Sequence, residues 1–483
     1  MICRVEAASE QVINPPRDGC RVFHAQPGFR GPSREFLIAG WMVSTCWLHS
    51  QGMEANDMIL VSVDDHVVEP PDLFENYLPA AYRSRDDVPH VVRNGEGNDV
   101  WVYDGLEFPN IGLNAVAGRP RSEYGVDPTR FDEMRKGCWD VDARIDDMNA
   151  NGVLGSMCFP SFPRLCGQVF AEAKDHELAL VCLKAYNDWH LEGWCDRHPG
   201  RFIPLGLIPF WDIDLTVAET KRLAGRGFHA ISFSENPAKL GLPSLHSSHW
   251  DPFWAACQDL EIVPCLHIGS SSQIIVTSAD APFDVTATLQ PMNIVQAAAD
   301  LVWSPVLRNY PNLKIALSEG GVGWLPYFLD KIDLVYRKQS EWTGQDYGDS
   351  LPSDIFRAQV ITCSLDDQVT SDVAQRAGTA NMTWECDYPH SDSDWPESPE
   401  VTLAGMIELP DHVINHITHK NAMRLFHFDP SAHRTLENST VGALRAEAAA
   451  DGVDTEFKSM RQRAQTMGAA AGAQQSLLTP GRD

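Results

Sequence analysis

The chain has 483 residues, of which 43% are apolar and 22% charged, a composition typical of a globular protein with a large core. A formal net charge of −28, from 38 basic and 66 acidic residues, argues against nucleic acid or an anionic membrane surface as a partner. The 12 cysteines include no CxxC pair, and many have apolar neighbours, which indicates reduced core residues in a cytoplasmic protein. No run approaches the roughly 20 apolar residues that a membrane span needs.

Residues 1–57 show no periodicity and are interrupted by Pro15, Pro16, Pro27 and Pro32, so we predict an N-terminal extension there. Beyond it the pattern changes. Short β-branched runs alternate with longer helical stretches, which indicates βα units and a parallel sheet.

Eight short runs are predicted to be strands. Most are almost continuously apolar, as expected of parallel strands buried on both faces. They are Ile59–Val63, Val153–Phe159, Phe202–Ile208, His229–Phe233, Ile262–His267, Lys314–Leu317, Val360–Cys363 and Met382–Glu385. The helices predicted between them are Asp175–His198, Asp212–Gly225, His249–Leu260, Leu289–Arg308 and Trp324–Arg337. This pattern predicts an α/β fold, a (β/α)₈ TIM barrel over residues 58–428.

Two further segments depart from the alternation. Residues 72–140 hold Pro, Gly and Asp clusters and a hairpin-like run at Trp101–Phe108, which predicts an insertion after strand one. Such an insertion lies over the mouth of a barrel as a lid, or forms a dimer contact. The tail over 429–483 is predicted to be helical or disordered, with one exposed helix after residue 435 followed by disorder.

The first strand ends in a pair of possible metal ligands. Residues two apart in an extended chain face the same side, so Asp64 and His66 point together and Asp65 points away. An Asp-x-His pair is a reasonable two-ligand arm, although, for the pair taken alone, a capping aspartate beside an unrelated histidine is the favoured explanation.

Other strands end in the same way. His267 ends strand five, Asp387 follows strand eight, Glu319 follows strand six before a Gly pair, and Glu235 follows strand four. Carboxylates gathered at one partly desolvated barrel face repel each other unless a cation lies between them. The set of nitrogen and oxygen ligands therefore predicts one or two divalent ions, Zn, Fe or Mn.

Three polar residues on predicted helices are interpreted as structural. Arg144, next to Asp146 and Asp147, is typical of a solvated helix face. Asn187 and His190 lie on the long helix and are predicted to be surface or interhelix contacts.

At these strand ends the sequence resembles the amidohydrolase superfamily, and within it the branch named for aminocarboxymuconate-semialdehyde decarboxylase. The resemblance covers residues 58–428 and rests on the motifs Val63–Val67 with Glu69–Pro71, His267–Gly269, Asp387–His390 and Asn421–Phe426. It implies a barrel that binds metal. It does not imply a substrate, because one barrel hosts many chemistries.

The sequence departs from that family at two positions. The usual strand-one motif is H-x-H, and Asp64 stands in its first place. Decarboxylases of this branch carry a histidine at the end of strand six, where this chain has Glu319. The second departure counts against a simple transfer of their mechanism.

The resemblance implies either of two ligand sets. In a binuclear site, Asp64, His66 and Asp387 hold one ion, His267 and Glu319 hold the other, and Glu235 bridges them. In a mononuclear site the ligands are Asp64, His66, His267 and Asp387, which leaves Glu235 and Glu319 to contact substrate or transfer protons.

The leading functional hypothesis is hydrolysis of a small organic substrate with a carbonyl group: an ester, thioester, amide or activated C–C bond. A metal-activated water would attack, and Asp387 would act as general base and then acid. The alternative is non-oxidative decarboxylation of an organic acid, with Asp387 as the proton donor and His390 or Glu319 assisting. A barrel that keeps metal only for structure is a third hypothesis. We expect a homodimer, which is the commonest assembly of such enzymes.

Overall fold

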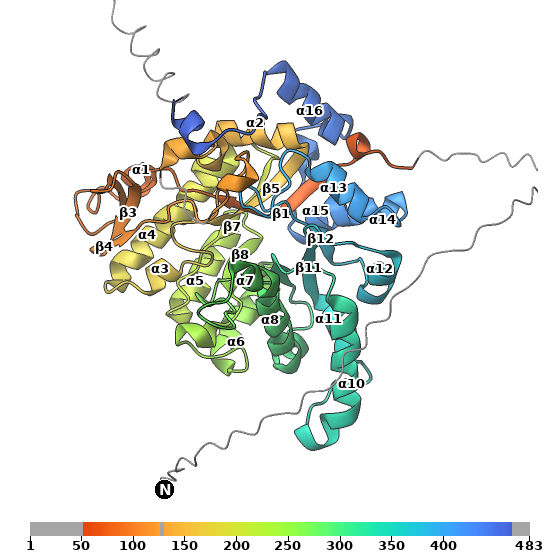
Figure 1. Cartoon of the computed structure of the whole chain (residues 1–483). Helices are drawn as coiled ribbons and strands as arrows, with labels where there is room; N and C mark the ends of the chain where they lie inside the picture. Colours follow the sequence, from red (N-terminus) through yellow and green to blue (C-terminus); the bar gives the residue numbers. More distant parts are fainter. Residues whose placement is uncertain (1–51, 126–129, 466–483) are drawn as a thin grey trace, which may run out of the picture. The chain divides into compact units, whose positions relative to one another are not determined.

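The computed structural model describes residues 52–125 and 130–465 (Figure 1). The predicted extension over 1–57 therefore lies outside the described residues except for its last positions, and so does the end of the predicted tail from residue 466. Among the described residues, no helix is both long enough and apolar enough to cross a membrane.

The centre of the described chain is a sheet in which every pair of neighbouring strands is parallel. Its order is β6-β5-β1-β12-β11-β10-β9-β8-β7. The strands are β1 (Leu60–Val67), β5 (Val153–Pro160), β6 (Phe202–Ile203), β7 (Leu205–Gly206), β8 (Ala230–Ser234), β9 (Val263–His267), β10 (Ile315–Ser318), β11 (Val360–Ser364) and β12 (Met382–Trp384). All eight runs predicted as strands are confirmed, with bounds that differ by a few residues.

The chain itself joins the two ends of this order. β6 pairs with β5 and β7 pairs with β8, yet only Pro204 separates Ile203 from Leu205. Proline has no N–H to donate, so it interrupts the ladder within what is one strand. With β6 and β7 taken as one strand, the order is a ring of eight, and the predicted (β/α)₈ barrel is confirmed.

Side chains of the preceding helical region bind the backbone of this interrupted strand and of Leu207, the residue after it. Asn187 in α4 (His176–Trp189) accepts from the Leu207 N–H at 2.8 Å and donates to the Leu207 carbonyl at 2.9 Å. His190, in the π-helical turn His190–Trp194, accepts from the Leu205 N–H through Nε2 at 3.3 Å. Both side chains are buried, so the prediction of surface contacts was wrong, whereas the interhelix alternative is confirmed for Asn187, which donates to Glu219 in α5 (Ile213–Ala224) at 2.8 Å.

The inside of the ring is packed with apolar side chains. One buried cluster takes members from strands on all sides, among them Val63, Met157, Cys265 and Ile361, and only the interior of a closed sheet brings these together. Phe428 belongs to the same cluster, and a Cβ on Gly155 near the start of β5 would meet its ring at 2.6 Å. The barrel is therefore filled near the N-terminal ends of its strands.

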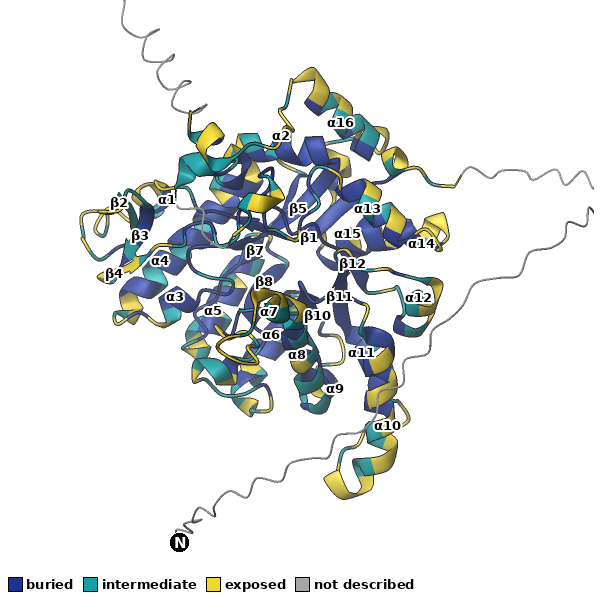
Figure 2. Cartoon of the chain, in the orientation of Figure 1, coloured by how far each residue is buried: buried dark blue, intermediate teal, exposed yellow. Residues whose placement is uncertain are grey.

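Helices surround the ring, and Figure 2 shows buried strands inside a layer of helices whose outer faces are exposed. The longer ones are α2 (Val141–Asn151), α4, α5 (Ile213–Ala224), α6 (Asp251–Asp259), α8 (Met292–Trp303), α10 (Leu325–Thr343), α11 (Pro352–Gln359) and α13 (Ser398–Gly405). Shorter helices include α1 (Leu73–Tyr77), α3 (Gln168–Ala171), α12 (Ser371–Ala377), α14 (Asp411–Asn415) and α15 (Asn421–Leu425).

One predicted helix is divided. The segment predicted as Leu289–Arg308 forms α8, the end of α7 (Phe283–Leu289) and most of α9 (Val306–Asn309). Pro291 and Pro305 stand at the N-cap positions of α8 and α9, because a residue without an N–H fits the start of a helix and breaks its interior.

The segment after β1 contains the predicted hairpin. β2 (His90–Arg93), β3 (Asp99–Tyr103) and β4 (Leu106–Phe108) form an antiparallel sheet, in which Trp101 pairs with Phe108. Trp101 is fully buried and stacks on Phe162 at 4.6 Å between ring centroids. This small sheet is thereby anchored to the loop that follows β5.

The C-terminal region packs on the barrel. α16 (Val441–Ala450) buries Val441 and Leu444, and the Val441 N–H donates to the Met58 carbonyl at 2.8 Å. The helix in the tail was predicted to be exposed, but α16 is half buried.

Candidate metal centre

The direction of Asp64 and His66 depends on an irregularity in β1. Up to Val63 the odd-numbered residues of β1 face the barrel interior, so strict alternation would turn Asp64 and His66 outward. The register between β1 and β5 shifts just before Asp65, and such bulges re-aim side chains. Asp64 and His66 therefore face the mouth of the barrel, while Asp65 turns away to accept a hydrogen bond from Ser156.

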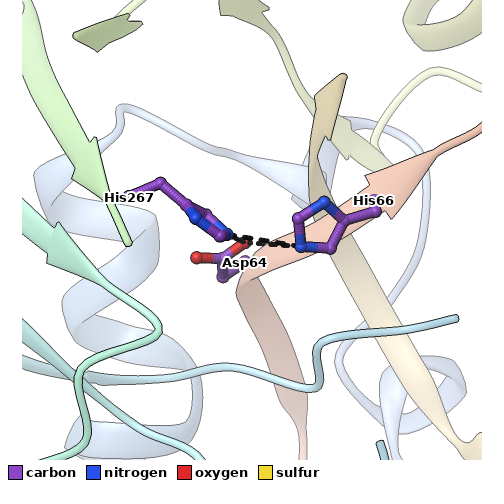
Figure 3. Close-up of side chains that lie close together, drawn as sticks. All are labelled: Asp64, His66 and His267. Carbon is purple, nitrogen blue, oxygen red and sulfur yellow. Dashed lines mark hydrogen bonds and ion pairs between the residues drawn. The ribbon is translucent and has the colours of Figure 1, made fainter. Parts of the chain in front are cut away.

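Asp64, His66 and His267 meet at the C-terminal ends of β1 and β9 (Figure 3). The His267 Nε2 lies 3.5 Å from the Asp64 Oδ1 and 3.3 Å from the His66 Nε2, and the His66 Nε2 lies 3.7 Å from the same carboxylate oxygen. All three side chains are buried. The residues predicted as ligands from strands one and five are thus brought together.

The tautomer of His267 suits a metal ligand. Its Nδ1 lies 2.6 Å from the Ile268 carbonyl oxygen, and a carbonyl can only accept, so Nδ1 carries the proton. The Nε2 lone pair is left facing Asp64 and His66. Histidine ligands in metalloproteins are oriented by the same kind of hydrogen bond on the far ring nitrogen.

Asp387 and His390 close the other side of this group. The Asp387 Oδ1 lies 3.0 Å from the His66 Nε2 and 3.1 Å from the His390 Nδ1, and the rings of His66 and His390 stack at 3.6 Å. The backbone holds the arrangement, since the Asp387 N–H donates to the Asp64 carbonyl at 2.9 Å. Asp387 has a φ of 54°, a strained backbone that aims its carboxylate at the histidines.

These residues fit a divalent cation. Both carboxylate oxygens of Asp64 and the Oδ2 of Asp387 are buried without a hydrogen-bond donor, a costly state for an anion unless a cation neutralises it. Burial raises the pKa of the Asp64 carboxyl well above its usual range, and the charge of Asp387 adds to the effect. Burial also favours the uncharged form of Asp387, but the charges and hydrogen bonds of His390 and His66 outweigh it and lower its pKa.

Glu319 lies at the edge of the group. Its Oε2 is 3.0 Å from the His267 Nε2, its φ is 56°, and it is 9% exposed. The glycine that follows serves close packing rather than flexibility, because a Cβ at Gly320 would meet the Ile294 side chain at 2.5 Å. Burial, and then the charges of Asp387 and Asp64, raise the pKa of the Glu319 carboxyl well above its usual range. Glu319 also borders a cavity of about 390 Å³ that opens beside the centre.

Glu235 stands apart from the predicted ligands. Its Oε1 accepts from Ser271 at 2.6 Å, and its Oε2 accepts a short hydrogen bond from Ser270. Glu235 is absent from the described groups whose ligand atoms converge within 4.8 Å, which comprise Asp64–His66–His267, His66–Asp387–His390 and Glu319–Asp387–Asp392. The two carboxylate oxygens of Glu235, predicted to bridge two ions, thus accept hydrogen bonds from serine hydroxyls, and the bridging role stays a prediction.

Sequence reasoning missed two buried residues here. Glu385 is fully buried, accepts from the Glu319 N–H at 3.2 Å, and has its pKa raised well above the usual range by burial and the charge of Asp64. It is two residues before Asp387, so the argument that paired Asp64 with His66 would have found it.

The second is Arg144, whose predicted place on a solvated helix face was wrong. Its side chain is fully buried and donates to the carbonyls of His66 at 2.5 Å and Gly137 at 2.6 Å. The guanidinium also stacks over the Tyr388 ring at 4.6 Å. Arg144 thus joins the end of β1 to the loop that carries Asp387.

A family model described as amidohydrolase matches residues 70–428, more than half of the chain. A curated relative, 2-amino-3-carboxymuconate-6-semialdehyde decarboxylase of Dictyostelium discoideum, is 22% identical over 320 residues, which cover 65% of this chain and 84% of the relative. These matches confirm the resemblance stated from the sequence.

Solved structures agree in fold. An amidohydrolase of Mycobacterium avium subsp. paratuberculosis superposes with a TM-score of 0.60 at 19% identity, covering 76% of this chain and 99% of its own. A dihydroxybenzoic acid decarboxylase of Polaromonas, solved with bound manganese and the inhibitor 2-nitroresorcinol, gives 0.52 at 16% identity, covering 79% and 99%. At these identities the likeness is one of fold.

Proposed function

This chain belongs to the amidohydrolase family, whose members use divalent metal ions, and we propose that it is a metal-dependent decarboxylase of a small organic acid. The observation that carries the proposal is that the groups Asp64–His66–His267 and His66–Asp387–His390 share His66, while both carboxylate oxygens of Glu235 accept hydrogen bonds from serines. This arrangement fits one ion, and we associate hydrolysis with a binuclear site, in which Glu235 would bridge two ions. The named activities of two similar proteins, both decarboxylases, point the same way.

The proposed ligands are two imidazole nitrogens and two carboxylate oxygens, a set that suits Zn, Fe or Mn. We favour manganese, because the Polaromonas decarboxylase binds it. When bound, such an ion supplies positive charge that holds a substrate carboxylate and offsets negative charge as its C–C bond breaks.

Glu319 is the proposed proton donor. It borders the cavity and lies 3.0 Å from His267, so a substrate in the cavity reaches it directly. The bond between the substrate carbon and its carboxyl group breaks, the electron pair stays on that carbon, and carbon dioxide leaves. The Glu319 proton then passes to the carbon, and the carboxylate regains a proton from water. Glu319 thus occupies the place of the strand-six histidine that the decarboxylases of this branch carry.

His390 has a positioning role in this proposal. Its 3.1 Å contact with the proposed ligand Asp387 and its stacking on His66 fix the ring of His66. Glu385 holds the backbone of Glu319 through the 3.2 Å hydrogen bond from its N–H.

The test combines metal content, measured by plasma mass spectrometry on protein purified without a chelating tag, with carbon dioxide release from a panel of phenolic and unsaturated acids. We expect about one ion per chain. His267→Ala should lose it, whereas Glu319→Gln should keep it and lower the turnover number by roughly 10²- to 10⁴-fold. His246→Ala, a half-exposed histidine paired with Asp300, serves as the matched control.

Two ions per chain, with one lost in Glu235→Gln, would contradict the mononuclear site. Ester or amide cleavage without carbon dioxide release would return hydrolysis to first place. Full activity in Glu319→Gln would remove Glu319 as the proton donor.

A further inference from the structure

The cavity beside Glu319 is lined by acidic side chains and by no basic ones among the described residues. Its lining combines an apolar wall with carboxylates, and among the described residues that line it there is no lysine, arginine or histidine. The apolar wall includes Met292, Trp324 and Leu365, and the carboxylates belong to Glu319, Asp366, Asp367 and Asp392.

Only some of these carboxylates are available to a ligand. Asp367 accepts from the N–H groups of Val322 at 3.0 Å and Gly323 at 2.9 Å, so it is engaged in holding the loop after β10. Asp366 and Asp392 are exposed and form no ion pair with a lysine or arginine among the described residues. Their charges therefore face the cavity, with His390 as a nearby group that favours the charged form of Asp392.

A second observation links the cavity to the candidate metal centre. Asp392, Glu319 and Asp387 offer oxygens that lie within 4.8 Å of one another. Asp387 is fully buried, and its Oδ2 has no hydrogen-bond partner among the described residues. Because the proposed ion offsets the charge of Asp387 and Glu319 holds a proton, the field that remains at the cavity is that of Asp366 and Asp392, which attracts a cation and repels a second anion.

We propose that the substrate is a monocarboxylic acid that carries a cationic group, an ammonium or amidinium, at its other end. The inference rests on the proposed function, which places the carboxyl group at the candidate metal centre. The cationic group lies between Asp366 and Asp392, and the apolar middle of the molecule packs on Trp324, whose ring also favours a nearby cation. A second carboxylate or a phosphate on the substrate is disfavoured.

The test is calorimetric binding to the manganese-loaded protein. The probes are 3- and 4-(aminomethyl)benzoate, with a cationic arm, 4-methylbenzoate, with a neutral arm, and terephthalate, with an anionic arm. We expect at least tenfold tighter binding of an aminomethyl acid than of 4-methylbenzoate, and weaker binding of terephthalate than of either.

Variants assign the preference to the two aspartates. Asp366→Asn with Asp392→Asn should weaken binding of the aminomethyl acid at least tenfold and leave 4-methylbenzoate unchanged. Glu341→Gln, an exposed carboxylate near the far end of α10, is the matched control and should change neither.

Equal affinity for all probes, or a preference that survives the double substitution, would overturn the proposal. So would the loss of one manganese per chain in the double variant, because the acidic mouth would then hold a second ion. Preferential binding of the aminomethyl acid without carbon dioxide release from any acid would support the charge preference and defeat the decarboxylase function. Carbon dioxide release from neutral acids, with equal binding of cationic and neutral probes, would support the decarboxylase function and overturn the charge preference.

Discussion

Arg144 is the residue that ties the candidate metal centre to its surroundings. Burial raises the pKa of Asp65 to about 7, and the Arg144 charge opposes that rise. Arg144→Met would leave the Asp65 carboxylate without a cation and two carbonyls without a donor, and we expect a loss of about 3–5 kcal/mol in the free energy of unfolding. Guanidinium denaturation measures this loss.

Arg144→Lys supplies the control, because it keeps the charge but loses the flat, forked guanidinium that stacks on Tyr388. Its stability should fall between those of the parent and Arg144→Met. A methionine variant within about 1 kcal/mol of the parent would show that the buried charge contributes little.

Sequence reasoning succeeded where the residue type alone carried the information. His267 and Asp387 end apolar strands, and nothing but a ligand or a partner explains a titratable group there. It failed for Arg144, because an arginine beside Asp146 and Asp147 has the pattern of a solvated helix. Its true partners, the carbonyls of His66 and Gly137, are brought to it only by tertiary packing.

At the scale of elements, the ring is interrupted at Pro204, which divides one short strand into β6 and β7. Its hydrogen bonds depend on Asn187 and His190, and burial lowers the pKa of His190 to about 3. Between that value and its usual pKa of about 6.5, the unfolded chain binds a proton that the folded chain does not. Stability is therefore fully present above about pH 6.5 and falls as the pH drops.

We expect this histidine to make the protein less stable by about 2 kcal/mol at pH 5 than at pH 7.5. His190→Gln keeps an acceptor for the Leu205 N–H but does not titrate. Between pH 7.5 and pH 5, the free energy of unfolding of this variant should therefore fall by about 2 kcal/mol less than that of the parent protein. Urea denaturation of both proteins at the two pH values makes the comparison. Parallel losses in the two proteins would show that His190 is not the group that titrates.

The sequence predicted the strands well, because long apolar runs leave few alternatives. It could not predict the register shift in β1, which reverses the alternation between Val63 and Asp64. The prediction that Asp64 and His66 share a side was therefore sound, but their common direction is set by pairing with β5. The divided helix around Pro291 and Pro305 could have been found from the prolines alone.

At the scale of the whole molecule, residues 454–465 act as a strap across the segment that follows β1. The N–H of Lys458 donates to the Gly118 carbonyl at 2.9 Å, and Arg463 donates to the same oxygen. The N–H of Met460 donates to Glu123 at 3.1 Å, and Arg135 reaches the Asp454 carbonyl at 3.0 Å.

Truncation after Val453 should remove these four hydrogen bonds and lower the free energy of unfolding by about 2–4 kcal/mol. Faster amide hydrogen exchange is expected around Gly118 and not in the barrel strands. A chain truncated at residue 465 is the control and should match the full-length protein. Unchanged exchange around Gly118 in the shorter chain would contradict the role of the strap.

The sequence predicted the closed barrel from the succession of βα units alone. It could not rank decarboxylation above hydrolysis, because that choice turns on whether Glu235 bridges two ions. The hydroxyls of Ser270 and Ser271 that hold Glu235 come from the next strand's loop, and no spacing in the sequence shows that they reach it.

Closure of the ring at Pro204 also affects the tendency of the folded protein to aggregate at high concentration. A sheet that returns on itself has no edge strand whose free N–H and C=O groups could recruit another chain. Among the described strands, only those of the small sheet offer free edges. β2 and β4 are short, and Arg93 and Glu107 place charges on them. Within the part of the chain that the structure describes, edge-to-edge aggregation is therefore restricted to two brief, charged segments.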